Sequence, residues 1–236
     1  MVVGLGPGQR DLITPRALAS LHQAEVIIGY KTYIALIKDL ISDKQVISSG
    51  MRKETERARL AVDMAKQGKL VAVVSSGDPG VYGMAGIILE VAGDSVPVEI
   101  IPGVTAGTAA AALLGAPIMH DFTVISLSDL LTPWEKIVNR LHAAGQGDFV
   151  VIIYNPRSQG RQQQIEAARQ ILIEYRSPHT PVGIVRNAGR VDCQVVITDL
   201  ENLLKEEIDM VSTVIIGNSE TRLENGCMVT PRGYAL

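Results

Sequence analysis

The chain has 236 residues, of which 47% are hydrophobic but only 4% aromatic, and its formal net charge is -3. This length allows one large or two small domains, and the aliphatic composition is typical of buried parallel strands covered by helices. The acidic balance excludes a global basic field for nucleic acid. Cys193 and Cys227 lack the spacing of a metal site or a disulfide framework, so we expect no metal and a reduced, cytoplasmic compartment.

The first half of the chain alternates short apolar runs with helical patterns, which predicts a mostly parallel sheet. We expect strands at 2–3, 25–29, 45–48, 70–75 and 98–101, and helices at 14–22, 30–41, 53–67, 82–93 and 105–114. The last of these helices is rich in small residues and can therefore pack close to a sheet. The longest apolar stretch, 104–119, is too short and too often broken by Gly and Pro to cross a bilayer, so no membrane partner is expected.

The run Gly115-Ala116-Pro117 marks the expected domain border, which gives domains 1–116 and 117–236. Beyond it we expect strands at 122–127, 149–154, 182–186, 191–197, 213–217 and 227–230, and helices at 133–143 and 161–175. The turn Asn187-Ala188-Gly189-Arg190 indicates a hairpin. The second half therefore predicts a mixed, partly antiparallel sheet, and the fold class is α/β with two domains.

Four loops marked by Gly or Pro each follow a strand-like run. They are Gly4-Leu5-Gly6-Pro7-Gly8, Ser76-Gly77-Asp78-Pro79, Pro102-Gly103-Val104-Thr105 and Tyr154-Asn155-Pro156. A parallel sheet gathers its ligand groups at the carboxyl ends of its strands, so these loops predict one small-molecule cleft.

Each of these loops also has a purely structural explanation. The first is a poor dinucleotide fingerprint, because Pro7 lacks a backbone donor, Gln9 stands where the third glycine belongs, and no acid ends the second strand. A plain tight turn explains it equally well. Asp78 is placed either to accept hydrogen bonds from a ligand or to cap the next helix, and Thr105 is a natural helix N-cap.

Two further side chains have two interpretations each. His120 beside Asp121 is either a base or one half of a structural hydrogen bond. Arg157 lies in the loop after Tyr154, at the predicted cleft, or else on the solvated face of the following helix. The sequence contains no Ser-His-Asp set and no phosphate-binding Lys after a glycine loop, which leaves hydrolase and phosphotransferase functions little supported.

Taken together, these segments resemble the tetrapyrrole methylases over the whole chain. The matching strings are GLGPGQRDLIT, SSGDPGVYG, IPGVTAGTAAAALLGAP and VIIYNPRS. The strings GYKTYIALI, LGAPIMHDFTVISLSDLLTPWE, NPRSQGR and TPRGY are similar to the branch that methylates carbon 17 of a precorrin-3B or cobalt-factor III macrocycle, with ring contraction, in cobalamin synthesis. The resemblance implies S-adenosylmethionine as methyl donor, S-adenosylhomocysteine as product, two α/β domains with a cleft, and a homodimer.

Carried over residue by residue, the resemblance implies these cofactor contacts: Pro7, Ser76, Gly77, Asp78, Val81, Thr105, Ala106, Tyr154, Asn155, Ala188, Thr213 and Val214. Ser76 stands where relatives often have glycine, and Asn155 where others have Met. Ring contraction needs proton transfer, for which Asp11 and His120 are the candidates. The substrate carries many carboxylates, so the candidate substrate-binding cations are those in or beside loops: Arg10, Lys31, Arg52 and Arg157.

Three other functions stay open at this level. The first is a related methyltransferase for another corrin position, or for a protein or RNA target. The second is a nucleotide-dependent oxidoreductase, which the poor fingerprint disfavours. The third is a binding module without catalysis, in which the loops serve structure alone. Thermal stabilisation by S-adenosylmethionine, by NAD or by neither separates these three.

Overall fold

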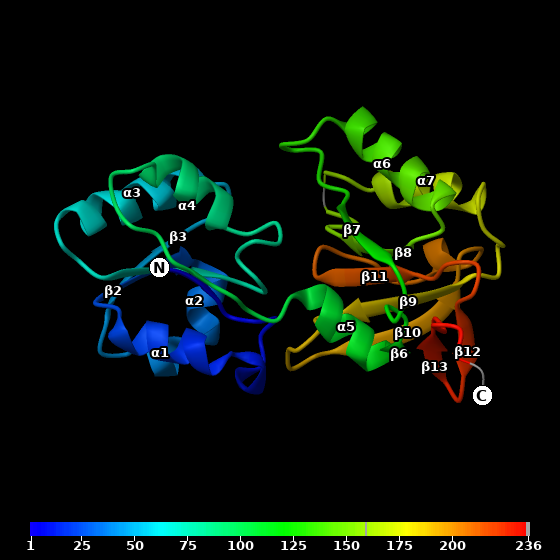
Figure 1. Ribbon diagram of the computed structural model, residues 1–236, viewed down its shortest axis with the longest axis horizontal. Helices are drawn as coiled ribbons and strands as arrows, with labels where there is room; N and C mark the ends of the chain where they lie inside the picture. Colours follow the sequence, from blue (N-terminus) through cyan, green and yellow to red (C-terminus); the bar gives the residue numbers. More distant parts are fainter. Residues whose placement is uncertain (159, 235–236) are drawn as a thin grey trace. The chain divides into compact units, whose positions relative to one another are not determined.

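The computed structural model describes residues 1–158 and 160–234 and divides into two compact units, Met1–Ala106 and Gly107–Leu236 (Figure 1). We call them the N-terminal and the C-terminal unit. The division falls at Ala106, whereas the expected border followed Ala116. The helix between these positions accounts for the difference, because its buried side chains Ala110, Ala111 and Leu114 belong to the core of the C-terminal unit. In the described part of the chain, no helix is long and apolar enough to cross a membrane.

The N-terminal unit is built on a five-stranded parallel sheet of order β3-β2-β4-β1-β5. Its strands are β1 (Val2–Gly4), β2 (Val26–Tyr30), β3 (Gln45–Ser49), β4 (Val71–Ser75) and β5 (Ile100–Ile101). The central strands are buried along their length, as their runs of Val and Ile predict. The prediction of a parallel sheet is confirmed.

Helices cover both faces of this sheet (Figure 1). The helices α1 (Pro15–Gln23) and α2 (Lys31–Leu36) pack on one face, and α3 (Glu54–Lys66) and α4 (Ala85–Ala92) on the other. Short 3-10 turns, η1 (Arg10–Leu12) and η2 (Lys38–Leu40), complete the first layer. The chain leaves β1 towards α1 and leaves the neighbouring strand β4 towards α4. These two strands therefore form a topological switch point, the place where open α/β sheets bind ligands.

The C-terminal unit has a five-stranded mixed sheet of order β10-β9-β11-β8-β7. Its strands are β7 (Phe122–Ser126), β8 (Val150–Tyr154), β9 (Pro181–Arg186), β10 (Gln194–Asp199) and β11 (Ser212–Ile216). Only the pair β7 and β8 is parallel, and the predicted hairpin joins β9 to β10. The prediction of a mixed, partly antiparallel sheet is confirmed.

The helices α6 (Trp134–Gln146) and α7 (Gln164–Ile173) pack on one face of this sheet, and α5 (Ala106–Leu114) on the other. A 3-10 turn, η3 (Leu203–Lys205), packs with the first layer. A Cβ added at Gly107 would lie 3.0 Å from the Tyr154 hydroxyl and 3.2 Å from Ile152, so the small residues of α5 do allow close packing. A second sheet joins β6 (Gly115–Ala116), β12 (Arg222–Glu224) and β13 (Cys227–Val229).

The buried side chain of Arg176 stabilises one edge of the C-terminal unit. This edge lies opposite to the carboxyl ends of β7 and β8. The Arg176 guanidinium donates to the carbonyl oxygens of Gly217, Ala144 (3.3 Å) and Phe149 (2.5 Å). Burial lowers the pKa of Arg176 to about 10, so this side chain stays charged at neutral pH. Its hydrogen bonds thus tie the end of α6, the start of β8 and the end of β11 together.

Candidate active site

Three loops of the N-terminal unit meet at the carboxyl ends of β1, β4 and β5. Gly6 and Gly77 exchange backbone hydrogen bonds of 3.2 and 2.7 Å, which joins the loop after β1 to the loop after β4. Both glycines have positive φ angles, 69° and 65°, which other residues rarely adopt. The first glycine-rich run is therefore a turn that pairs with a second turn, and it lies at the switch point.

Gly4 and Gly103 lack side chains because the loops approach too closely for one. A Cβ at Gly103 would lie 2.2 Å from the Gly77 carbonyl oxygen, and a Cβ at Gly4 would lie 2.7 Å from the Gly103 nitrogen. Contacts this short exclude any side chain at either position without movement of the backbone. The loop after β5 thus packs directly on the other two.

The Asp78 carboxylate ties two of these loops with both of its oxygens. Oδ1 accepts a hydrogen bond of 2.8 Å from the Gly80 amide in its own loop, and Oδ2 accepts one of 3.0 Å from the Gly103 amide. A carboxylate has about four lone-pair sites, so it retains capacity for a ligand donor. Asp78 does not cap the next helix, since α4 begins at Ala85 with Met84 as its N-cap. Its structural role is instead to join two loops, and its contact with the cofactor stays a prediction.

The other predicted cofactor residues of this unit differ in exposure. Pro7 and Gly77 are buried, whereas Ser76, Val81, Thr105 and Ala106 are half-buried at the same loops. Half-buried polar and small groups beside a glycine junction fit a ligand held through backbone atoms, such as S-adenosylmethionine. Their role in cofactor binding stays a prediction.

The predicted cofactor residues of the C-terminal unit are more deeply placed. The Tyr154 hydroxyl accepts a 2.5 Å hydrogen bond from the Gly107 amide, and Asn155 has a φ angle of 51° while its Nδ2 donates to Ser126 Oγ at 2.9 Å. Ala188 and Thr213 are buried, and the Val214 side chain lies in the hydrophobic core. Any ligand contact of Val214 would therefore go through its backbone.

The two candidate acid–base residues are both exposed. Asp11 lies on η1. His120 Nδ1 accepts a 2.9 Å hydrogen bond from the Asp121 amide. The Asp121 carboxylate also lies 3.7 Å from Nδ1, so His120 makes the local contact that was its alternative interpretation, and its role as an acid or base stays a prediction.

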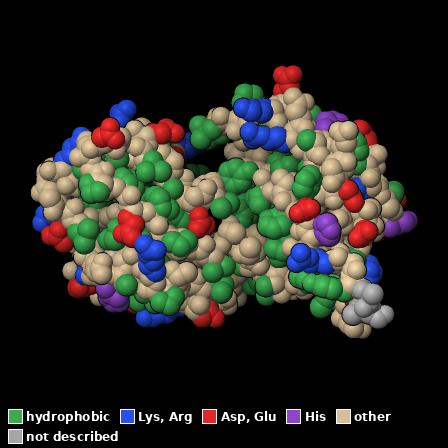
Figure 2. All heavy atoms as spheres, viewed as in Figure 1, with side chains coloured by type: hydrophobic (Ala, Val, Ile, Leu, Met, Phe, Trp, Pro, Cys, Tyr) green, Lys and Arg blue, Asp and Glu red, His purple; other side chains and the backbone are tan. Residues whose placement is uncertain are grey.

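The candidate substrate-binding cations differ in whether a carboxylate of the chain neutralises them. Arg10 forms a 2.6 Å ion pair with Asp39. Lys31 and Arg52 are exposed, and within residues 1–158 and 160–234 no ion pair neutralises them. Arg157 lies in the loop after β8 rather than on α7, which begins only at Gln164, and its Nε is buried without a hydrogen-bond partner in that same part of the chain. Figure 2 shows acidic and basic side chains interspersed over the visible face of each unit.

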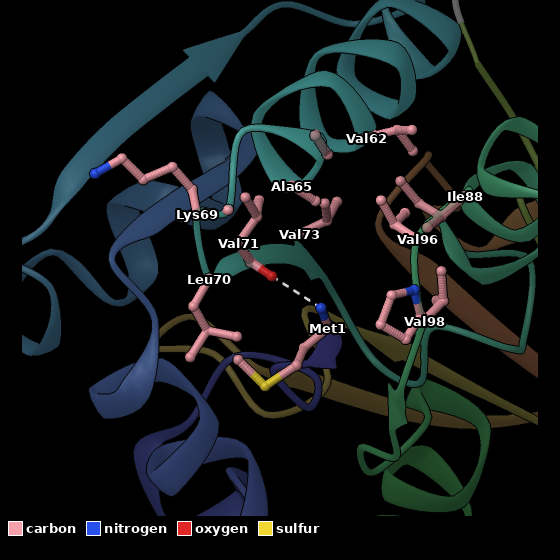
Figure 3. A pocket seen from close by; sticks show the side chains of 13 residues that line it. Met1, Val62, Ala65, Lys69, Leu70, Val71, Val73, Ile88, Val96 and Val98 are labelled. Carbon is pink, nitrogen blue, oxygen red and sulfur yellow. Dashed lines mark hydrogen bonds between the residues drawn. The ribbon is translucent and has the colours of Figure 1, made fainter. Parts of the chain in front are cut away.

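One cavity of the N-terminal unit lies away from these loops. It measures about 230 Å³ at the amino ends of the strands, between α3, α4 and the sheet (Figure 3). Its walls are almost wholly aliphatic, including Val62, Val73 and Ile88, and the Met1 amine at its floor donates to the Val71 carbonyl at 2.8 Å. Its charged lining groups are the Met1 amine and Lys69, and none of the predicted site residues lines it. Among the described residues, no cluster of His, Cys, Asp and Glu could hold a metal ion.

Comparison with known families agrees with this geometry. The family model of the tetrapyrrole (corrin/porphyrin) methylases matches residues 1–204. The chain therefore belongs to the tetrapyrrole methylase family and is a methyltransferase, as the motifs predicted.

Within the family, two curated relatives are about half identical to the chain. The probable cobalt-factor III C(17)-methyltransferase of Salmonella typhimurium is 50% identical over 238 residues, which cover 100% of this chain and 99% of that protein. The cobalt-factor III methyltransferase of Priestia megaterium is 51% identical over 241 residues. The match covers 99% of this chain but only 45% of that relative, so the chain spans about half of its length.

Solved structures confirm the fold. The methyltransferase CobJ is 39% identical and superposes with a TM-score of 0.93 over 98% of both chains. A uroporphyrin-III C-methyltransferase of Thermus thermophilus, complexed with S-adenosyl homocysteine, is 24% identical, with a TM-score of 0.70 over 92% of this chain and 95% of that one. The predicted fold class, two α/β domains of the tetrapyrrole methylase type, is confirmed.

Proposed function

We propose that this chain transfers a methyl group from S-adenosylmethionine to carbon 17 of a cobalt-factor III or precorrin-3B macrocycle, with ring contraction, in cobalamin biosynthesis. The observation that carries the proposal is the 50% identity to a relative of this name over the whole of both chains. The glycine junction at the switch point supports it, because it offers loop backbone at the place where such sheets bind ligands.

The residues that the chain presents suit a reaction of this kind. S-adenosylmethionine supplies a methyl group that is already activated, so no protein nucleophile or metal is needed. The task of the chain is to hold two reactants in line, which can lower the barrier by roughly 7–11 kcal/mol in favourable cases. A junction fixed by glycine contacts and by both oxygens of Asp78 provides the rigidity that this positioning requires.

Incubation of the purified chain with S-adenosylmethionine and cobalt-factor III tests the proposal. We expect a product heavier by one methylene unit, with nuclear magnetic resonance placing the new methyl group at carbon 17 and showing the contracted ring. A methyl group at another carbon would instead identify a related corrin methyltransferase. Stabilisation by NAD but not by S-adenosylmethionine in a thermal shift assay would refute the proposal in favour of an oxidoreductase.

We further propose a homodimer that works in the cytoplasm with no nucleic-acid or membrane partner. Two adjacent leucines on the loop between β7 and α6 support a covered surface, since Leu130 is 63% and Leu131 is 93% exposed. The free thiols Cys193 and Cys227 suit a reducing compartment.

Light scattering at micromolar concentration is expected to give the mass of two chains. Replacing both Leu130 and Leu131 by serine should shift that mass towards one chain, because it removes the most exposed apolar side chains of the loop. Serine at the comparably exposed Leu223, on β12, serves as the control and should leave the dimer intact. A wild-type chain with the mass of one copy would contradict the dimer.

A further inference from the structure

A second cavity in the N-terminal unit opens at the carboxyl edge of the sheet, beside the loop of Asp78. It measures about 160 Å³, and its wall includes Val74 and Ser75 at the end of β4. Pockets for whole small molecules usually start at about 300 Å³. The cavity therefore suits one side arm of a larger ligand rather than a complete macrocycle or cofactor.

Aromatic and sulfur-containing side chains form much of the wall. Tyr30 and Tyr33 meet edge to face with ring centroids 5.2 Å apart, and Met51 and Tyr82 are both 58% exposed. Such groups give an apolar lining with phenolic hydroxyls as donors. The lining thus suits a flexible arm that has methylene groups and a polar end.

The backbone at Tyr82 is strained in a way that places this ring on the wall. Its φ angle is 53°, a left-handed conformation that is costly for a bulky residue. The next residue, Gly83, packs so tightly that a Cβ there would lie 2.7 Å from both Ser75 Oγ and the Pro79 carbonyl. Glycine would adopt this backbone conformation with less strain, so the presence of tyrosine indicates that its ring has a function.

A buried guanidinium supplies donors to the cavity. Arg57 is only 6% exposed, and its hydrogen bonds go to Ser49 Oγ (2.9 Å), the Gly50 carbonyl (2.9 Å) and Glu54 Oε1 (3.0 Å). A guanidinium carries five N–H groups, so donors remain beyond these three bonds. Glu54 also lines the cavity and balances the charge of Arg57, so additional positive charge must come from outside the wall.

Two cations stand next in sequence to lining residues. Lys31 follows Tyr30 and Arg52 follows Met51, and both are exposed and without an ion pair in the described part of the chain. Arg52 also has a positive φ angle, 60°. Both non-glycine residues of this unit with left-handed backbone are thus beside or on the wall of the same cavity.

We propose that this cavity binds one carboxylate arm, an acetate or a propionate, of the macrocycle. The proposal rests on the proposed function, since it takes a polycarboxylate tetrapyrrole as the ligand. The methylene groups of the arm contact the tyrosine rings and Met51, and the carboxylate accepts from Arg57. Arg52 and Lys31, each next in sequence to a lining residue, add positive charge near the carboxylate. The cavity would thereby fix the rotation of the macrocycle next to the cofactor loops.

Binding of uroporphyrin III, a fluorescent polycarboxylate tetrapyrrole, tests the cavity by fluorescence anisotropy without any methyl transfer. We expect Arg52→Gln to weaken this binding about tenfold, because one of the positive charges that attract the carboxylate is lost. Tyr82→Gly should weaken it as well and still fold, since glycine favours the backbone conformation at that position. The affinity for S-adenosylmethionine, measured by calorimetry, should not change in either variant.

Arg59→Gln is the matched control, because Arg59 is an exposed arginine of α3 with no ion pair to the residues that the structure describes, and the substitution removes the same charge. It should bind uroporphyrin III as the wild type does. Equal losses in Arg52→Gln and Arg59→Gln, or unchanged affinity in both Arg52→Gln and Tyr82→Gly, would overturn the inference. Failure of the wild type to methylate cobalt-factor III would refute the proposed function instead, and this is a separate measurement.

Discussion

Replacing Asp78 by alanine is expected to weaken the binding of S-adenosylmethionine at least tenfold and to lower the free energy of unfolding of the chain by about 2–4 kcal/mol. The physical reason is that the carboxylate accepts hydrogen bonds from the amides of Gly80 and Gly103, in two different loops. Hydrogen bonds to a charged group contribute roughly 1.5–3 kcal/mol each, and the partial exposure of Asp78 keeps each of the two near the lower end of that range. Without them, the loop after β5, which carries Thr105 and Ala106, loses one of its attachments to the loop after β4.

Calorimetry with S-adenosylmethionine and a denaturant titration measure the two effects. Asp78→Asn should lie between alanine and the wild type, because its amide keeps one acceptor oxygen while its NH₂ group faces an amide donor. Asp63→Ala is the control, because Asp63 is an exposed aspartate of α3 whose carboxylate has no hydrogen bond or ion pair in the described part of the chain. Unchanged cofactor affinity in Asp78→Ala would remove Asp78 and its loop from the candidate site.

Local sequence patterns predicted the parallel sheet and the loops because their causes are local. A buried parallel strand such as β4 needs an unbroken run of apolar residues, and a tight turn after it needs glycine or proline. The start of α1 also has a local cause, because Thr14 stands just before Pro15 and its hydroxyl accepts a hydrogen bond from the Ala17 amide. These features follow from residues within a few positions of one another.

Features that depend on distant contacts could not be predicted in this way. The strands β6 and β12 have two and three residues, and they exist only because they pair with β13. The helix expected at 82–93 begins at Ala85, since the tight loop around Tyr82 and Gly83 takes up the preceding residues. The division after Ala106, rather than after Ala116 as expected, has a similar cause, because α5 packs against residues far along the chain.

The candidate site likewise combines features that local sequence predicts with features that depend on distant contacts. The glycines at positions 4, 77 and 103 were visible as turn signals, but their mutual contact depends on strand order, which no short motif contains. Arg57 was missed because an arginine in an amphipathic helix is usually solvated, and only the fold shows that it is buried.

Replacing Arg157 by alanine is expected to raise the Michaelis constant for the macrocycle about tenfold and to leave the affinity for S-adenosylmethionine nearly unchanged. The loop that carries Arg157 is held on both sides. Asn155 donates to Ser126 Oγ at 2.9 Å and accepts from Arg161 at 3.2 Å, and Ser158 and Arg161 exchange backbone hydrogen bonds. Arg157 itself keeps a buried Nε without a partner among the described residues. A buried donor that lacks a partner costs roughly 1–3 kcal/mol, and a substrate carboxylate would recover that cost.

Steady-state kinetics at two salt concentrations separate this role from a general effect of charge. The increase in the Michaelis constant should be larger at low salt, because ions screen the attraction between the guanidinium and a carboxylate. Arg140→Ala, at an exposed arginine of α6 in the same unit, removes the same charge and should change neither constant. If Arg157→Ala weakens cofactor binding and spares the macrocycle, then Arg157 belongs with the cofactor residues, and the substrate cations must be sought at Arg52 and Lys31.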